Sequence, residues 1–93
     1  MEFTYDDYGD TVLYDVFYEA GTYYGGVLVA LSDQAEARGD HSRVRTLLDQ
    51  RIALRRERAS VAPDDRDAQI ACIEKWHAQA RHARESLFVQ NAS

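Results

Sequence analysis

Apolar side chains recur at intervals of three and four residues through the last third of this sequence. They are Ile70, Ile73, Trp76, Ala80, Ala83 and Leu87. This spacing places them on one face of an α-helix. Pro63 disfavours helix at Ala62, and Asp64 or Asp65 can cap a helix that begins just after it. We therefore expect a long helix over residues 64–88.

A shorter helix is expected over residues 42–59, after the Gly39 break and with Ser42 as its N-cap. Its apolar residues form a broad arc: Val44, Leu47, Leu48, Ile52 and Leu54. Arg51 and Arg55 project within that arc. A buried arginine needs a partner, so we expect acids of the first helix to pair with them, or their stems to reach the surface. The cluster Arg55, Arg56 and Arg58 suits a solvated helix end near its negative dipole.

Residues 9–38 allow two interpretations. Residues 11–20 are rich in β-formers, so they could pair with 27–31 as a hairpin turning at Gly25 and Gly26. A single helix instead gives the stripe Leu13, Phe17, Ala20, Tyr24, Val27 or Leu28, Leu31 and Ala35. Its three internal glycines cost on the order of 1 kcal/mol each. We prefer the helix, because the stripe is unbroken.

The elements together predict one all-α domain over residues 1–93, an antiparallel three-helix bundle with a long first helix. Residues 1–8 would form an N-terminal arm. The hairpin interpretation would instead give an α+β fold, with an N-terminal hairpin on two helices.

Charge is distributed unevenly along the chain. Residues 1–40 hold nine acids and one base, a net −8, whereas residues 41–93 hold ten bases and seven acids, a net +3. An acidic half repels phosphates, which makes a nucleic-acid partner unlikely on charge alone. The single cysteine, Cys72, favours a reducing cytosol, and the longest aliphatic run, residues 27–31, is too short for a bilayer. We expect a cytoplasmic protein with no membrane partner.

Catalytic motifs are not apparent in the sequence. It has no glycine-rich phosphate loop and no Ser-His-Asp set. His77 and His82 are five residues apart, on different helix faces, and Cys72 gives them no chelating spacing. We expect no enzyme activity, no cofactor and no metal, and therefore a protein that acts by binding another protein.

The candidate partner-binding residues are tyrosines, one phenylalanine and acids near the N-terminus. They are Phe3, Tyr5, Asp7, Asp10, Tyr14, Asp15, Tyr18 and Glu19. On a helix, Asp15 and Glu19 share one face, and Tyr14 and Tyr18 share the adjacent one. Tyrosine with acid suits docking into a basic, partly apolar cleft. The competing interpretation is that tyrosines lie flat over the core, and we favour it for Tyr23 and Tyr24.

The chain resembles the epsilon antitoxins, small three-helix proteins that neutralise zeta toxins. The resemblance covers residues 3–87 and rests on short matches in order: Phe3-Thr4-Tyr5 followed by an acid, Tyr24 with Val27-Leu28, Glu74-Lys75-Trp76, and Leu87. The chain departs from that family in the three glycines of its first helix and in its arginine-rich second helix.

The resemblance implies a mechanism and a partner. Zeta toxins are P-loop kinases that phosphorylate an amino-sugar nucleotide, and the antitoxin's N-terminal segment and first helix would occupy the ATP cleft. The partner would then be a cognate zeta-like kinase, contacted by the eight candidate residues. The alternative is a helical adaptor or regulatory module, which would bind an acidic partner or nucleic acid through its second helix.

Overall fold

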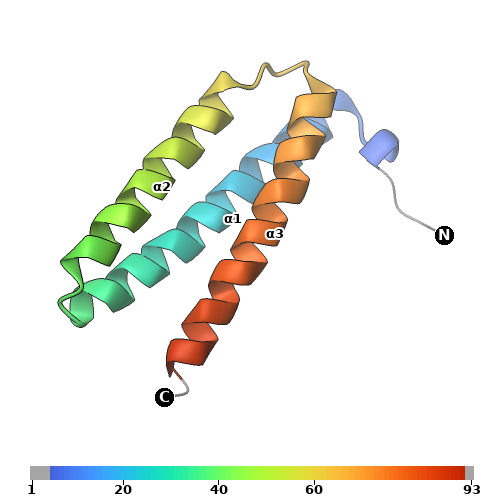
Figure 1. The fold of residues 1–93 in the computed structure, drawn as a ribbon. Helices are drawn as coiled ribbons and strands as arrows, with labels where there is room; N and C mark the ends of the chain where they lie inside the picture. Colours follow the sequence, from blue (N-terminus) through green and yellow to red (C-terminus); the bar gives the residue numbers. More distant parts are fainter. Residues whose placement is uncertain (1–4, 92–93) are drawn as a thin grey trace.

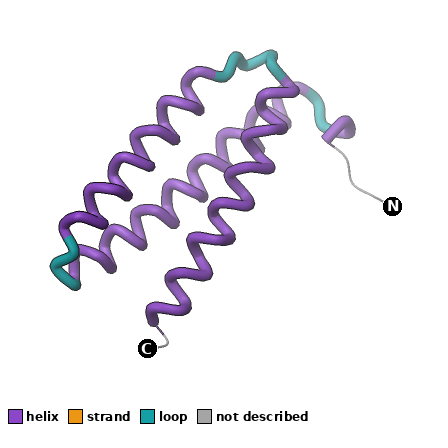
Figure 2. Tube along the Cα trace, in the orientation of Figure 1, coloured by secondary structure: helices purple, strands orange, loops and turns teal. Residues whose placement is uncertain are grey.

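The computed structural model describes residues 5–91 of the chain. A short 3-10 turn, η1 (Tyr5–Asp7), precedes three α-helices: α1 (Asp10–Ala37), α2 (His41–Ser60) and α3 (Arg66–Asn91). The helix ends lie within three residues of those expected. Among the described residues there is no strand (Figure 2), so the hairpin interpretation is wrong and the all-α three-helix bundle is confirmed.

The three helices form a layer with α1 in the middle. Successive helices run in opposite directions, and α2 and α3 pack mainly against α1 and little against each other (Figure 1). The Cα trace accordingly measures 45 × 31 × 14 Å. One broad side of α1 is therefore left uncovered, and this exposes the candidate residues of its first turns.

The core is the apolar stripe of α1 set between its two neighbours. The stripe predicted for α1 is buried except for the half-buried Tyr24. Trp76 of α3 is 1% exposed, stacks on Phe17 at 5.3 Å between ring centroids, and donates its indole N–H to Glu57 of α2 at 2.9 Å. One side chain thus joins all three helices, and its burial agrees with its place in the predicted apolar stripe.

The connection between α1 and α2 is a tight turn at Gly39. This glycine has φ +72°, and the amide of Asp40 donates to the carbonyl of Ala35 at 2.9 Å. A left-handed glycine followed by this bond ends a helix in the Schellman manner. The N-cap of α2 is Asp40, whose Oδ1 accepts from the Arg43 amide at 3.1 Å. The prediction of Ser42 as the cap is wrong, because α2 begins at His41 and Ser42 already lies inside the helix.

Side chains in and just before the first turn of α3 form hydrogen bonds that fix the loop between α2 and α3. Asp65 caps this helix, since its Oδ1 accepts from the Ala68 amide at 3.1 Å. Gln69, which is 1% exposed, donates its side-chain amide to the carbonyls of Ala62 and Pro63 at 3.0 and 2.9 Å. The loop carbonyls before α3 are therefore satisfied by the helix that they precede.

The predicted apolar arc of α2 is only partly buried. Leu47 and Leu54 lie in the core, but Leu48 and Ile52 are 47% and 39% exposed. The prediction fails because α2 packs mainly against α1, and a helix with one neighbour buries a narrow stripe.

Candidate functional site: the outer face of the first helix

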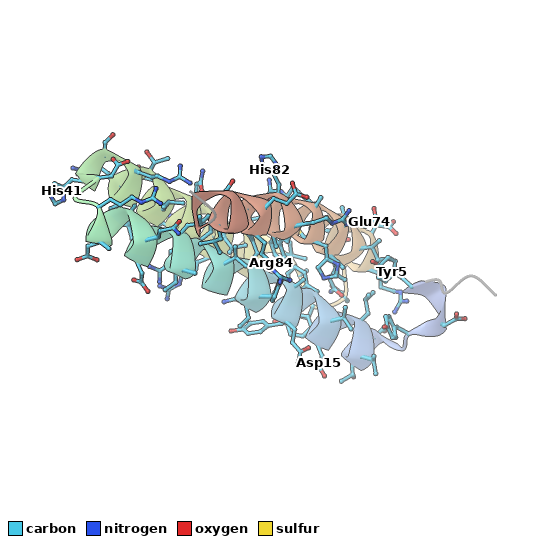
Figure 3. The ribbon with its side chains drawn as sticks, turned by 90° about the horizontal axis from the view of Figure 1, so that it is seen from below. Tyr5, Asp15, His41, Glu74, His82 and Arg84 are labelled. Carbon is cyan, nitrogen blue, oxygen red and sulfur yellow. The ribbon has the colours of Figure 1, made fainter. Side chains whose placement is uncertain are left out.

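The candidate residues lie in η1 and along the first three turns of α1, apart from Phe3, which is outside the described residues. Asp15 and Glu19 are exposed and sit one turn apart, on the face of α1 away from the core. In Figure 3 the labelled Asp15 side chain projects outward from α1. Val12, also on this helix, is 48% exposed. Carboxylates and an apolar side chain are therefore presented together.

The four candidate acids differ in whether they have a partner. Asp7, Asp15 and Glu19 are exposed, and no ion pair or hydrogen bond joins their carboxylates to another described residue. Asp10 is paired with Arg66, at 2.7 Å between Oδ1 and Nη1. Three of the four carboxylates therefore remain available to a partner protein.

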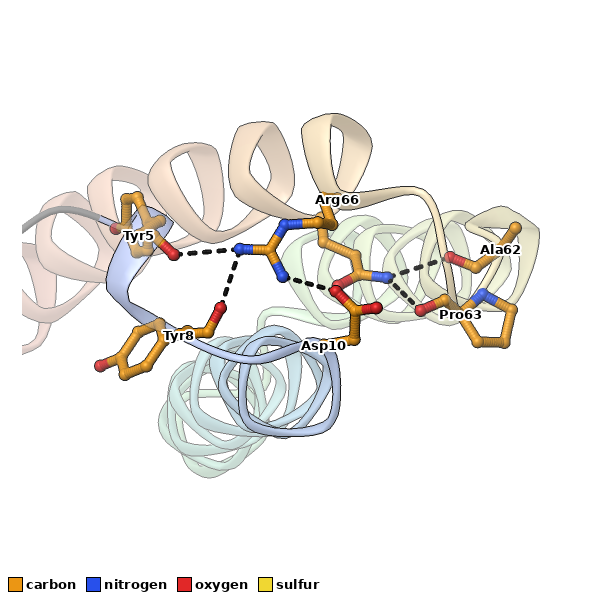
Figure 4. Close-up of polar contacts among 7 residues, drawn as sticks. Tyr5, Tyr8, Asp10, Ala62, Pro63 and Arg66 are labelled. Carbon is orange, nitrogen blue, oxygen red and sulfur yellow. Dashed lines mark hydrogen bonds and ion pairs between the residues drawn. The ribbon is translucent and has the colours of Figure 1, made fainter.

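Arg66 also holds the segment before α1 in place. Its Nη2 donates to the carbonyls of Tyr5 at 3.2 Å and Tyr8 at 3.0 Å, while Nη1 reaches Asp10 (Figure 4). The first residue of α3 thus fixes both η1 and the start of α1. Sequence reasoning missed Arg66, because nothing local links it to residues 56 positions earlier in the chain.

The two candidate partner-binding tyrosines on α1, Tyr14 and Tyr18, have different surroundings. Tyr14 is half-buried, with its ring centroid 5.7 Å from that of Phe17 and 6.3 Å from that of Tyr18. It therefore lies over the edge of the core. Tyr18 is 47% exposed, but Arg58 of α2 covers one face of its ring, with the guanidinium carbon 4.0 Å from the centroid. A partner can reach only the uncovered part of Tyr18.

Arg58 is held in that position by hydrogen bonds to α1. Its Nη1 donates to the Tyr18 carbonyl at 3.3 Å and to the Thr22 hydroxyl at 3.1 Å. Arg51 and Arg55, by contrast, have no ion-pair partner among the described residues. Of the two expectations for these arginines, pairing with acids of the first helix is wrong, whereas the half-buried Arg51 and the exposed Arg55 agree with side chains that reach the surface.

The tyrosines at positions 23 and 24 also differ. Tyr24 is half-buried against the core, and burial raises its pKa, opposed by the charge of Lys75. Tyr23 is 47% exposed, and its hydroxyl accepts from Nη1 of Arg84 at 2.9 Å. The interpretation that both lie flat over the core is right for Tyr24 and wrong for Tyr23.

Glu57 and Cys72 have shifted pKa values, and both lie away from the acidic face of α1, next to the core. The hydrogen bond from Lys75 lowers the pKa of Glu57, against desolvation and with help from the Trp76 N–H. Burial raises the pKa of the Cys72 thiol, and the Glu57 charge raises it further. A protonated buried thiol is a poor nucleophile. The Glu57 carboxylate already accepts hydrogen bonds from Lys75 and Trp76.

Within residues 5–91, no three side chains of the metal-binding types come together. No helix in that part of the chain combines the length and the apolar character needed to cross a membrane. Comparison with protein-family models, curated proteins and solved structures finds no match to this chain. The functional argument therefore rests on the residues and their arrangement.

Proposed function

We propose that this protein is an inhibitory binding protein that inserts the outer face of α1 into a basic cleft of a partner protein. The observation that carries the proposal is the pair of exposed carboxylates of Asp15 and Glu19, which have no partner among the described residues. They stand beside an exposed valine, Val12, on a helix whose opposite face is fixed by the core.

A nucleotide site is the kind of cleft that suits this face. P-loop proteins bind phosphates with backbone N–H groups, a helix N-terminus and a lysine, so the cleft attracts anions. Carboxylates on a rigid helix can occupy the positions of phosphates at little cost in conformational entropy. Together with the resemblance to epsilon antitoxins, this favours a zeta-type P-loop kinase as the partner and exclusion of its nucleotide as the mode of inhibition.

The Arg66 contacts support the same proposal, because they hold η1 next to the acidic face. Ordering a segment before it binds lowers the entropy cost of association. The segment that contains Tyr5 and Asp7 would then meet the partner in the position in which it already lies.

The test is inhibition of a zeta-type kinase by this protein and by matched charge variants. Asp15→Lys with Glu19→Lys places two cations against a basic cleft, and we expect inhibition to weaken about 100-fold or more. Asp33→Lys with Glu36→Lys makes the same charge change on exposed residues near the other end of α1. This control should inhibit much as the unchanged protein does. The proposal would be contradicted if both variants lost inhibition equally, or if neither lost it.

A further inference from the structure

The arginines of α2 line a hollow that the proposed kinase contact does not use. It lies between α1 and α2 and measures about 300 Å³. Arg51, Arg55 and Arg58 follow one another at intervals of four and three residues, so they share one helix face. The rest of the lining is small or apolar: Gly21, Thr22, Gly25, Val29 and Leu54.

The charge of this hollow is uniformly positive. No carboxylate is among its lining residues. Arg58 is fixed by its bonds to α1, with its guanidinium over Tyr18. Arg51 is half-buried and Arg55 is exposed, and neither forms an ion pair with a described residue. A half-buried unpaired arginine is unfavourable, so an anion arriving in the hollow would be stabilised by charges already in place.

An exposed apolar strip runs beside these arginines. Leu48 and Ile52 are 47% and 39% exposed and sit one turn apart. Leu48 lies three residues before Arg51, and Ile52 lies three residues before Arg55, so they are direct neighbours on the helix surface. Arginine next to exposed apolar side chains is the composition found at the centre of protein–protein interfaces.

We infer that Leu48, Arg51, Ile52, Arg55 and Arg58 form a second interaction surface, the α2 docking surface, for an acidic segment of a partner protein. The segment would carry carboxylates for the arginines and apolar side chains for Leu48 and Ile52. The inference does not rest on the proposed kinase inhibition.

Nucleic acid fits this surface less well. Three arginines could contact phosphates, but a phosphate backbone offers nothing to cover two exposed aliphatic side chains. The neighbouring helix α1 carries exposed acids, including Asp33 and Glu36, and these would repel the strand on either side of the contact. The observed chemistry therefore favours an acidic protein segment.

The experiment uses a random peptide library displayed on phage and selected against the full chain. We expect enriched peptides to combine Asp or Glu with Leu, Ile or Phe. A synthetic peptide of the enriched sequence is then titrated while the Arg Nε–Hε signals are followed by NMR, and the signals of Arg51 and Arg55 should shift. Arg51→Glu with Arg55→Glu should weaken its binding about tenfold or more.

The matched control is Arg38→Glu with Arg81→Glu, which makes the same charge change on exposed arginines that lie outside α2. This control should keep most of the affinity, and circular dichroism checks that both variants remain helical. Selection without acidic enrichment, an absence of enriched peptides, equal weakening by both variants, or tighter binding of duplex DNA than of any peptide would overturn the inference. Kinase inhibition measured on the same variants shows whether the two surfaces act separately.

Discussion

Arg66 gives the most detailed test of how the N-terminal segment is held. The variant Arg66→Ala removes an ion pair to Asp10 and two hydrogen bonds, to the carbonyls of Tyr5 and Tyr8. These contacts join η1 to α3, so their loss should loosen η1 while leaving the core stripe packed. The free energy of local opening at η1 should therefore fall more than the free energy of global unfolding.

The magnitude follows from the exposure of the groups. The Asp10 side chain is 75% exposed, so its ion pair with Arg66 contributes only about 0–1 kcal/mol. The two bonds to backbone carbonyls are partly buried, and each contributes about 1 kcal/mol net. The total is about 2 kcal/mol, which corresponds to roughly a 30-fold change in an equilibrium constant.

The assay is native-state amide hydrogen exchange at Tyr8, whose amide donates to the Tyr5 carbonyl at 3.1 Å and so closes η1. We expect exchange roughly 30-fold faster in Arg66→Ala. Arg66→Lys should give a smaller increase, because an ammonium keeps the charge but not the planar fork. Arg56→Ala, on an exposed part of α2, is the control and should change nothing. An unchanged Tyr8 exchange rate in Arg66→Ala would refute the reasoning.

The remaining predictions concern stability, measured by urea unfolding. Gly26→Ala should raise the free energy of unfolding by about 1 kcal/mol, since an added Cβ would meet nothing within 4 Å. Gly21→Ala should lower it, because the Cβ would lie 3.2 Å from the buried Trp76 ring. Gly39→Ala should lower it by about 1 kcal/mol, because φ there is +72°. Glu57 has a lowered pKa, so it stabilises the fold above its ordinary value of 4.5, and this contribution is lost as the pH falls through the lowered value. The stability difference between wild type and Glu57→Gln should therefore vanish in acid; a difference that persists there contradicts the account.

The sequence predicts the first and third helices well because their apolar stripes are long. In α1 the stripe from Leu13 to Ala35 overrides the β-propensity of residues 11–20, and three internal glycines do not break it. Periodicity shows which residues share a face, but it does not show how many neighbours a helix has. Periodicity therefore could not predict that Leu48 and Ile52 of α2 are exposed, although they recur at helical spacing with the buried apolar residues.

The candidate site could be predicted only in part. The exposure of Asp15 and Glu19 follows from their place opposite the stripe. Two contacts could not be predicted from the sequence: that of Arg66 with Asp10 and that of Arg58 with Tyr18. They join residues 56 and 40 positions apart in the chain. Such pairs depend on how the helices pack, and a single sequence carries no local signal for them.

The most direct test of the central claim is competition with nucleotide on a zeta-type kinase. A fluorescent ATP analogue is bound to the kinase, and this protein is added at increasing concentration. We expect complete displacement, with an apparent affinity that weakens in proportion to the analogue concentration, and no displacement by Asp15→Lys with Glu19→Lys at matched concentration. A ternary complex that retains the analogue, or displacement that survives the double substitution, would contradict the account.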